Sequence, residues 1–438
     1  MRSSEIPADI GDDIRDDQGV WEEIFSSTNL VVALKRVERN RGAPGVDGLS
    51  AEDLRDWLKE HWVGTRVALD AGMYVPLPVR QVMIPKPGGG QRMLGVPSVL
   101  DRLIQQAISQ VLSPIFDPGF VPVSFGFRPN KSAHDAVRVA KTVISQGYRW
   151  VVEVDLDAFF DRVNHDMLMA RVARKVKDKR VLKLVRRYLE AGIMADGVLQ
   201  STGEGTPQGS PLSPLLSNIM LDDFDQEFWK RGHRFVRYAD DIRIFLRSKR
   251  AATRVLDQAT KVLEECLSLR VNQDKSTIDP ATVATLLGFG FYFTNKGVKI
   301  RVAPKAFTRM KDHIRKLTSR KWSVSMEYRI MKLNQYVRGW MGYFRLSSTP
   351  RKFSKLDQWF RRRMRQILWK QWKRPRTRVT QLRRLGIRPD LAYQWAMSSR
   401  AYWRIAASPV LTRALPNQYW TDQGLVLFRP AWDKFQTT

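Results

Sequence analysis

Tyr238-Ala239-Asp240-Asp241 is the stretch that decides the fold, because it lies between two runs typical of the paired strands of a hairpin. Residues 233–238 and 242–248 are rich in β-branched and aromatic side chains, so both acids fall at the turn. Adjacent carboxylates on a tight turn repel each other unless a cation lies between them or water screens both. The turn is therefore either a cation site or an ordinary solvated loop.

A second acidic strand end precedes this turn in the chain. The apolar run Trp150-Val-Val-Glu-Val-Asp155 continues into Leu156-Asp157-Ala158-Phe159-Phe160-Asp161, so Asp155 leaves its strand at the end. Acids on two neighbouring strands can hold two Mg²⁺ ions about 3.5 to 4 Å apart, an arrangement that stabilises the attacking and leaving oxygens of phosphoryl displacement. The two strand ends together indicate nucleotidyl transfer.

These two motifs occur in order with a third, Thr206-Pro-Gln-Gly-Ser-Pro-Leu-Ser-Pro-Leu-Leu-Ser-Asn218. In this combination the chain resembles reverse transcriptases, most closely those of bacterial group II introns, over about residues 28–430. Strands and helices alternate irregularly, which fits an α+β fold. The resemblance implies a right-hand polymerase with fingers and palm, an α-helical thumb and a short basic C-terminal tail.

The resemblance also implies the catalytic centre. Asp155 and Asp240 are the expected ligands of the two Mg²⁺ ions, and the Leu156 carbonyl is expected to complete one site. Asp241 is expected to be a third catalytic and metal-binding acid that contributes more weakly, either directly or indirectly. In the reaction, a primer 3′-hydroxyl attacks the α-phosphate of a deoxynucleotide, and positioning with charge neutralisation supplies most of the catalysis.

Two more residues are expected at the nucleotide. Phe160 lies where reverse transcriptases place a ring against the sugar, and such a ring would clash with a 2′-hydroxyl; core packing is the alternative, with Phe159 as the candidate for it. Lys275 matches the lysine that such polymerases place near the triphosphate, where it could protonate the leaving pyrophosphate. A lysine that follows an aspartate is otherwise an ordinary surface residue.

A glycine-rich hairpin tip and the Pro-Gln-Gly turn complete the expected nucleotide site. Lys86 and Arg92 flank the glycines between two strands of residues 79–97, and the resemblance places them over the triphosphate rather than in a plain flexible hairpin. The Gln208 amide is expected to reach the nucleotide or the templating base, and Gly209 to permit close approach. Ser210 stands where the intron enzymes usually have a second glycine.

Composition points to a nucleic-acid partner. The 438 residues carry a formal charge of +30, and residues 301–438 hold 32 Lys and Arg against six Asp and Glu. Lysines and arginines gain affinity by releasing counterions from phosphates, although a solvated basic face is the plainer reading of any one run. Nine of the 14 tryptophans fall in the same segment, which predicts aromatic surface among the charges at Trp340, Trp359, Trp369 and Trp372.

The sequence excludes some classes of protein. One cysteine, Cys266, permits no intramolecular disulfide and no cysteine zinc cluster, and we expect it to be buried on a helix over 251–269. No run of 18 apolar residues exists, and the first 30 residues are acidic. A membrane span or a secretory signal is therefore not expected. The family resemblance implies a bacterial, cytoplasmic location in association with nucleic acid.

Five segments are expected along the chain. They are a mobile acidic extension (1–20), a helical extension of the fingers (21–78), fingers and palm (79–303), a helical thumb or maturase X domain (304–375) and a basic DNA-binding tail (376–438). We expect no His- and Cys-containing nuclease domain, so the chain resembles the shorter, endonuclease-lacking lineage of the intron proteins.

The leading hypothesis is an RNA-directed DNA polymerase that also assists intron splicing as a maturase and carries out retrohoming. Its expected partners are an RNA template, a DNA or RNA primer, deoxynucleoside triphosphates, group II intron RNA and target DNA. The alternatives are a host-adopted reverse transcriptase in DNA repair or defence, an RNA-binding splicing factor with a vestigial polymerase, and an RNA-dependent RNA polymerase.

Overall fold

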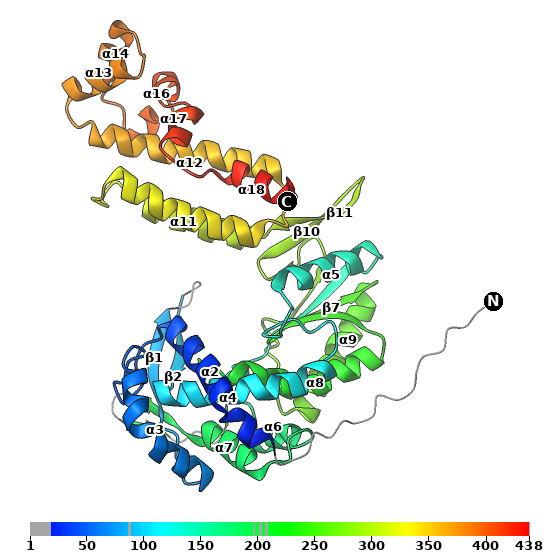
Figure 1. Cartoon of the computed structure of the whole chain (residues 1–438). Coiled ribbons are helices and arrows are strands. Elements are labelled where there is room, and N and C mark those ends of the chain that lie inside the picture. The colour runs from blue at the N-terminus through cyan, green and yellow to red at the C-terminus, as the bar shows by residue number, and fades with distance from the viewer. Residues whose placement is uncertain (1–18, 86–88, 196–197, 201–203, 206–208, 438) are drawn as a thin grey trace. The chain divides into compact units, whose positions relative to one another are not determined.

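The computed structural model describes residues 19–85, 89–195, 198–200, 204–205 and 209–437 (Figure 1). The expected acidic extension therefore lies almost wholly outside the described residues. The chain divides into two compact units, Met1–Asp279 and Pro280–Thr438, called unit 1 and unit 2 below. Both mix helices and strands, as an α+β chain should.

Unit 1 begins with helices. The helical segment expected from residue 21 starts with two separate helices, α1 (Val20–Ile24) and α2 (Ser27–Asn40). The break occurs because the Ser26 hydroxyl accepts a hydrogen bond from the Asn29 amide at 3.3 Å and so caps a new helix. α3 (Leu54–Asp70) follows, and the buried α4 (Val99–Phe116) packs against α2 and α8.

The glycine-rich hairpin belongs to a four-stranded sheet. β1 (Val79–Pro85) and β2 (Gln91–Val96) pair antiparallel, which confirms the expected hairpin. β4 (Ile193–Ala195) joins β1 in parallel and β5 (Val198–Gln200) pairs with β4, giving the order β2-β1-β4-β5.

A second sheet carries the acidic motifs. β3 (Trp150–Val154), β6 (Arg234–Tyr238), β7 (Asp241–Leu246) and β8 (Thr277–Pro280) lie in the order β6-β7-β3-β8. The β6–β7 hairpin confirms the expected strand pair, and β3 runs antiparallel to β7. Both acidic motifs therefore lie at strand ends of one sheet.

Helices pack around this sheet and complete the core of unit 1. They are α5 (Ala133–Ser145), α6 (His165–Val172), α7 (Lys179–Glu190), α8 (Ser213–Lys230) and α9 (Lys249–Lys261), with short 3₁₀ turns at Asp117–Gly119 and Phe159–Asp161. Rings of α8, Phe224 and Phe228, contact Phe235 of β6. The buried face of α8 thus fixes β6 from behind.

Cys266 is exposed, so the prediction of a buried cysteine was wrong. The helix over 251–269 changes to a π-turn at Val262–Cys266 after α9. This wider turn shifts the helical phase, so that Leu263 and Leu267 take the buried positions and the cysteine faces outward.

Unit 2 has a three-stranded sheet, β9 (Thr285–Leu286), β10 (Phe289–Thr294) and β11 (Gly297–Val302), in the order β11-β10-β9. Its helices are α10 (Pro304–Leu317), α11 (Met326–Phe344), α12 (Pro350–Gln371), α13 (Pro375–Arg384), α14 (Pro389–Ala396), α15 (Tyr402–Ile405), α16 (Pro409–Ala414), α17 (Asn417–Asp422) and α18 (Phe428–Thr437). The segment expected to be helical, 304–375, holds the three long helices α10, α11 and α12. The small sheet clusters with these helices, whereas the change in composition pointed to a boundary at 304.

A buried carboxylate holds α18 on α12. Asp357 accepts the amides of Phe428 and Arg429 at 2.7 and 2.9 Å, so it caps the first turn of α18 from a neighbouring helix. Burial raises the pKa of Asp357 to about 6, against the lowering effect of those two amides. This contact ties the last helix to the body of unit 2.

The tryptophans of unit 2 are only partly a surface feature. Trp369 and Trp372 are buried, which corrects the expectation of aromatic surface there. Their indole rings pack together on the apolar side of α12, with centroids 6.1 Å apart. Trp340 and Trp359 are half-buried.

Among the described residues, none of the helices combines the length and the apolar character that a membrane span needs.

Candidate active site

Three acids meet at one end of the β6-β7-β3-β8 sheet. Val154 of β3 pairs with Ile242 of β7, so Asp155 and Asp241, one position further, lie at facing strand ends. Tyr238 pairs with Asp241, which leaves Ala239 and Asp240 as a two-residue turn. Ala239 has a positive φ of 56°, as the first residue of a tight hairpin turn requires. Asp240 is exposed at this turn.

The charges of Asp155 and Asp240 affect the pKa of Asp241. Burial raises the pKa of Asp241, Arg243 opposes this shift, and the charges of Asp240 and Asp155 raise it further. Carboxylates that disfavour each other's ionisation in this way form a site where a cation is stabilised.

Arg243 was not expected from the sequence. Its guanidinium forms ion pairs with Asp241 and, at 2.8 Å, with Glu153, the residue directly opposite it on β3. Arg243 thus forms an ion pair with Asp241. Asp155 and Asp240 are the neighbours of Asp241 at this end of the sheet. The sequence does place an acid on β3 and a base on β7, and such opposite charges can pair across neighbouring strands. Predicting the pair would have required the register of β3 against β7.

The segment before β8 completes the site from the other side of β3. The Asn272 amide donates to the Asp155 carbonyl at 2.8 Å, and the Asp155 amide donates to the Ser276 hydroxyl at 3.1 Å. Lys275 is thereby held with its Nζ 3.8 Å from Asp155 Oδ2, although its side chain is 69% exposed. The sequence-predicted Lys275 and Asp155 therefore lie together.

The donor chemistry fits magnesium. Carboxylate and carbonyl oxygens are the ligands that Mg²⁺ takes, usually from one or two carboxylates plus substrate phosphates. Within the described ranges, no group of three or more His, Cys, Asp or Glu side chains is arranged to hold a metal by itself. A site built on Asp155 and Asp240 would thus depend on a nucleotide for further oxygens. Leu156, whose carbonyl was assigned to one site, bridges to Val271 and has a buried side chain.

The two phenylalanines of the Asp155 block lie differently. Phe159 is 3% exposed and belongs to the core, whereas Phe160 is only partly buried, with its ring centroid 5.1 Å from that of Phe159. Asp157 pairs with Arg162 at 3.2 Å. Phe160 thus packs against the core and stays partly exposed, in the 3₁₀ turn that follows β3.

The remaining nucleotide residues are only partly described. Lys86, Gln208 and the side chain of Arg92 lie outside the described residues. Gly209 has a φ of 115°, and a Cβ there would lie 2.8 Å from the Gly95 carbonyl oxygen, so the close approach it permits in this structure is to β2.

The serine that replaces the expected second glycine is buried. The Ser210 hydroxyl donates to Gln105 of α4 and accepts the Leu212 amide at 3.3 Å. This residue therefore anchors the start of α8 to α4 through its side chain.

Unit 2 contains a basic groove with aromatic walls. A cavity of about 420 Å³ is lined by Arg301, Phe307, Lys311, Lys352, Lys355 and Trp359, together with Val302, Pro304 and Leu356. A neighbouring cavity of about 530 Å³ shares Arg301 and Lys352 and adds Lys299 and Arg351. No described residue that lines either cavity is acidic. These two cavities, called the unit 2 groove below, combine charge for phosphates with rings for base stacking.

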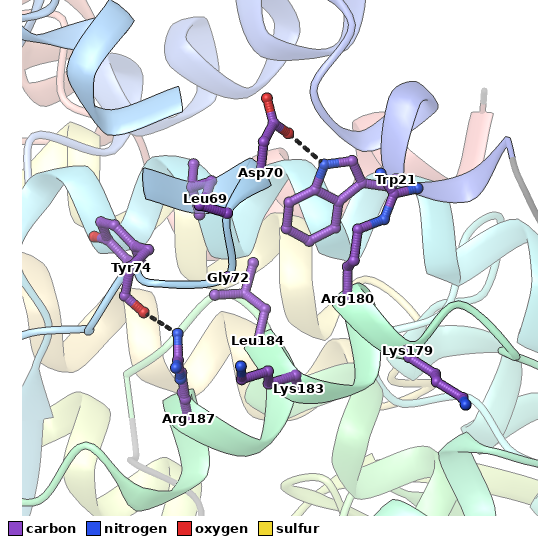
Figure 2. Close-up of a pocket in the computed structure, with 11 residues that line it drawn as sticks. Trp21, Leu69, Asp70, Gly72, Tyr74, Lys179, Arg180, Lys183, Leu184 and Arg187 are labelled. Atoms are coloured by element: carbon purple, nitrogen blue, oxygen red, sulfur yellow. Dashed lines mark hydrogen bonds between the residues drawn. The ribbon is translucent and has the colours of Figure 1, made fainter. Parts of the chain in front are cut away.

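A further cavity of about 210 Å³ lies in unit 1 between α7, Trp21 and the end of α3 (Figure 2). Its polar groups largely engage each other: the Trp21 indole donates to Asp70 at 2.7 Å, and Arg187 donates to the Tyr74 carbonyl at 2.6 Å. Arg180 lies over the Trp21 ring. None of its lining residues is a predicted site residue.

Two family models match segments of this chain. Residues 84–291 match the reverse transcriptase (RNA-dependent DNA polymerase) family, and residues 307–386 match the maturase-specific domain of group II introns. Protein YkfC of Escherichia coli (strain K12) is 35% identical over 289 residues, which cover 57% of this chain and 76% of YkfC.

Other relatives are longer than the matched region. The group II intron-encoded protein LtrA of Lactococcus lactis subsp. cremoris is 36% identical over 203 residues, which cover 44% of this chain but 32% of LtrA. A solved chain of a partial Cas6-RT-Cas1--Cas2 complex is 24% identical, with a TM-score of 0.35, over 55% of this chain and 42% of its own. At that score the likeness establishes no shared arrangement of domains.

Proposed function

The chain belongs to the reverse transcriptases that carry a group II intron maturase domain, and we propose that it copies RNA into DNA and binds intron RNA to assist splicing. The family match makes it an RNA-directed DNA polymerase by class. The chain spans about a third of LtrA, so splicing and retrohoming by the whole protein belong to the proposal.

One observation carries the polymerase assignment. Asp155 and Asp240 converge at one end of a sheet, close enough with Asp241 that their charges raise its pKa. Carboxylates normally lie far apart, because like charges at close range destabilise each other's ionised form. A polymerase needs such a cluster to take up two cations.

Each residue has a proposed role in the reaction. When bound, two Mg²⁺ ions would neutralise charge on the triphosphate and favour ionisation of the primer hydroxyl. Asp155 and Asp240 would hold these ions, with the Leu156 carbonyl beside them. Asp241, engaged by Arg243, would tune the charge of the site without binding directly.

The chain's other residues would bind and orient the nucleotide. Lys275, whose Nζ lies 3.8 Å from Asp155 Oδ2, would donate a proton to the leaving pyrophosphate. The half-buried Phe160 would exclude a 2′-hydroxyl and so select deoxynucleoside triphosphates. Lys86, Arg92, Gln208 and Gly209 are proposed to surround the nucleotide on the strength of the family resemblance.

The expected polymerase regions also stand as proposals. Unit 1 would contain the helical extension (21–78) and most of the fingers and palm (79–303), and unit 2 the thumb (304–375) and basic tail (376–438). The unit 2 groove is the proposed contact for the RNA template with its DNA or RNA primer and for intron RNA, with the tail reserved for target DNA.

RNA-templated extension of a labelled primer, with and without Mg²⁺, tests the polymerase proposal. Extension that EDTA abolishes supports it. A folded protein that binds RNA but extends no primer would replace it with the splicing-factor alternative. Splicing of a group II intron transcript at near-physiological Mg²⁺, with and without the protein, tests the maturase part separately.

A further inference from the structure

The catalytic turn is held from behind by a buried polar network. Arg237, the residue before Tyr238 on β6, is fully buried. Its Nε donates to both carboxylate oxygens of Asp225 on α8, at 2.9 and 2.8 Å, and Asp225 is fully buried as well. A buried ion pair of this kind needs excellent geometry to compensate for the loss of solvation.

The same guanidinium reaches the turn itself. Its Nη1 donates to the carbonyl oxygen of Ala239 at 3.0 Å and to Oδ1 of Asn218 at 2.9 Å. Ala239 is the turn residue with the positive φ, and its backbone conformation orients the next residue, Asp240. One arginine thus connects the rigid helix α8 to the peptide that carries the predicted metal ligand.

A second set of contacts joins the turn to Phe125 and Gly126. The Asn218 amide nitrogen donates to the Gly126 carbonyl at 2.9 Å. Gly126 packs so closely on the turn that a Cβ there would lie 2.2 Å from the Ala239 nitrogen. The Phe125 amide also donates to the Arg237 carbonyl at 2.9 Å. The turn is therefore clamped between α8 and residues 123–126.

We propose that Arg237, Asp225 and Asn218 are positioning residues that hold the Ala239-Asp240 turn in the geometry that takes up catalytic Mg²⁺. Stability alone explains this network poorly, since apolar residues often replace a buried ion pair without loss of stability. One of its hydrogen bonds instead reaches the backbone carbonyl of Ala239, the residue before Asp240. This inference rests on the proposed polymerase function.

Arg237→Lys tests the proposal with a conservative change. Lysine keeps the charge beside Asp225 but cannot donate to Asp225, Asn218 and Ala239 together, because it lacks the planar fork of donors. Arg171→Lys is the matched control, since Arg171 is also a buried arginine of unit 1 and pairs with Asp223 of the same helix at 2.9 Å. The hydrogen bonds that the Arg171 guanidinium donates do not reach the turn.

Two readouts separate positioning from simple destabilisation. The first is Mn²⁺ binding to the protein–primer–template complex, measured by electron paramagnetic resonance, and the second is the Mg²⁺ concentration for half-maximal extension. For Arg237→Lys we expect about tenfold weaker Mn²⁺ binding and an about tenfold higher Mg²⁺ requirement, as when a residue that orients a metal ligand is removed. Arg171→Lys should match the wild type in both.

A second variant guards against failure to fold. Asn218→Leu leaves the Arg237–Asp225 pair in place but removes both hydrogen bonds of the Asn218 side chain, to Arg237 and to Gly126. It should shift both metal readouts in the same direction. Unchanged metal readouts in folded Arg237→Lys and Asn218→Leu would overturn the proposal, as would equal shifts in Arg171→Lys. A wild type that extends no primer but binds Mn²⁺ would instead count against the polymerase function itself.

Discussion

Neutralising the unit 2 groove should weaken RNA binding in a way that salt dependence reveals. The variant replaces Lys311, Lys352 and Lys355 with glutamine. These lysines line one cavity with the rings of Phe307 and Trp359, so a strand in the groove would lie close to all three charges. The change leaves the buried side chains of α10 and α12 in place.

The size of the effect follows from counterion release. Each lysine that neutralises a phosphate of single-stranded nucleic acid adds about 0.7 to the slope of log affinity against log salt, so removing three of them lowers the slope by about 2. At a salt concentration of about 0.1 M, the same three lysines are worth about 100-fold in affinity. The total charge falls only from +30 to +27, a small fraction of the whole.

Fluorescence anisotropy of a labelled RNA, titrated at several salt concentrations, measures both quantities. The matched control replaces three exposed cations of α9 in unit 1, Lys249, Arg250 and Arg254, with glutamine and so removes the same charge. If the control lowers the slope and the affinity as much as the groove variant does, diffuse charge drives binding and the reasoning about the groove is wrong.

Three further predictions concern single residues. Phe160→Ala should lower the preference for deoxy- over ribonucleotides by roughly 10- to 100-fold, measured as the ratio of kcat/KM values, and an unchanged ratio would return Phe160 to a packing role. Asp241→Asn should slow extension less than Asp240→Asn does, because Arg243 already engages Asp241; equal losses in single-turnover rates would make both direct ligands. Burial raises the pKa of Asp357 to about 6, so its folded form binds a proton more tightly than its unfolded form, and wild-type stability should fall as pH rises from about 4 to above 6. Asp357→Asn should therefore gain stability relative to wild type over that range, by at most about 3 kcal/mol in denaturant unfolding; a pH-independent difference would refute the shift.

Local sequence patterns predicted the elements that matter most for the site. The β-branched and aromatic residues on both sides of Asp240 and the apolar run before Asp155 are short-range signals, and all three strands formed where these signals predicted them. The amphipathic helices of unit 2 were also recognisable, since their apolar spacing spans several turns.

Other features depend on the register and phase of elements far apart in the chain. The pairing of Arg243 with Asp241 requires knowing which residue of β3 faces it, and the Arg237–Asp225 pair joins a strand to a helix. The exposure of Cys266 follows from a π-turn that no residue type announces. Burial of Trp369 likewise depends on which face of α12 is covered.

The central claim is that Asp155 and Asp240 form the metal site of an RNA-directed DNA polymerase. Primer extension on an RNA template with Mg²⁺ tests it directly, comparing deoxy- with ribonucleotides and the wild type with Asp240→Asn. We expect extension with deoxynucleotides that falls at least about 10³-fold in the variant, while RNA affinity stays within about twofold, since Asp240 is an exposed acid outside the basic groove. Undiminished extension by Asp240→Asn, or a parallel loss of RNA affinity, would contradict the account.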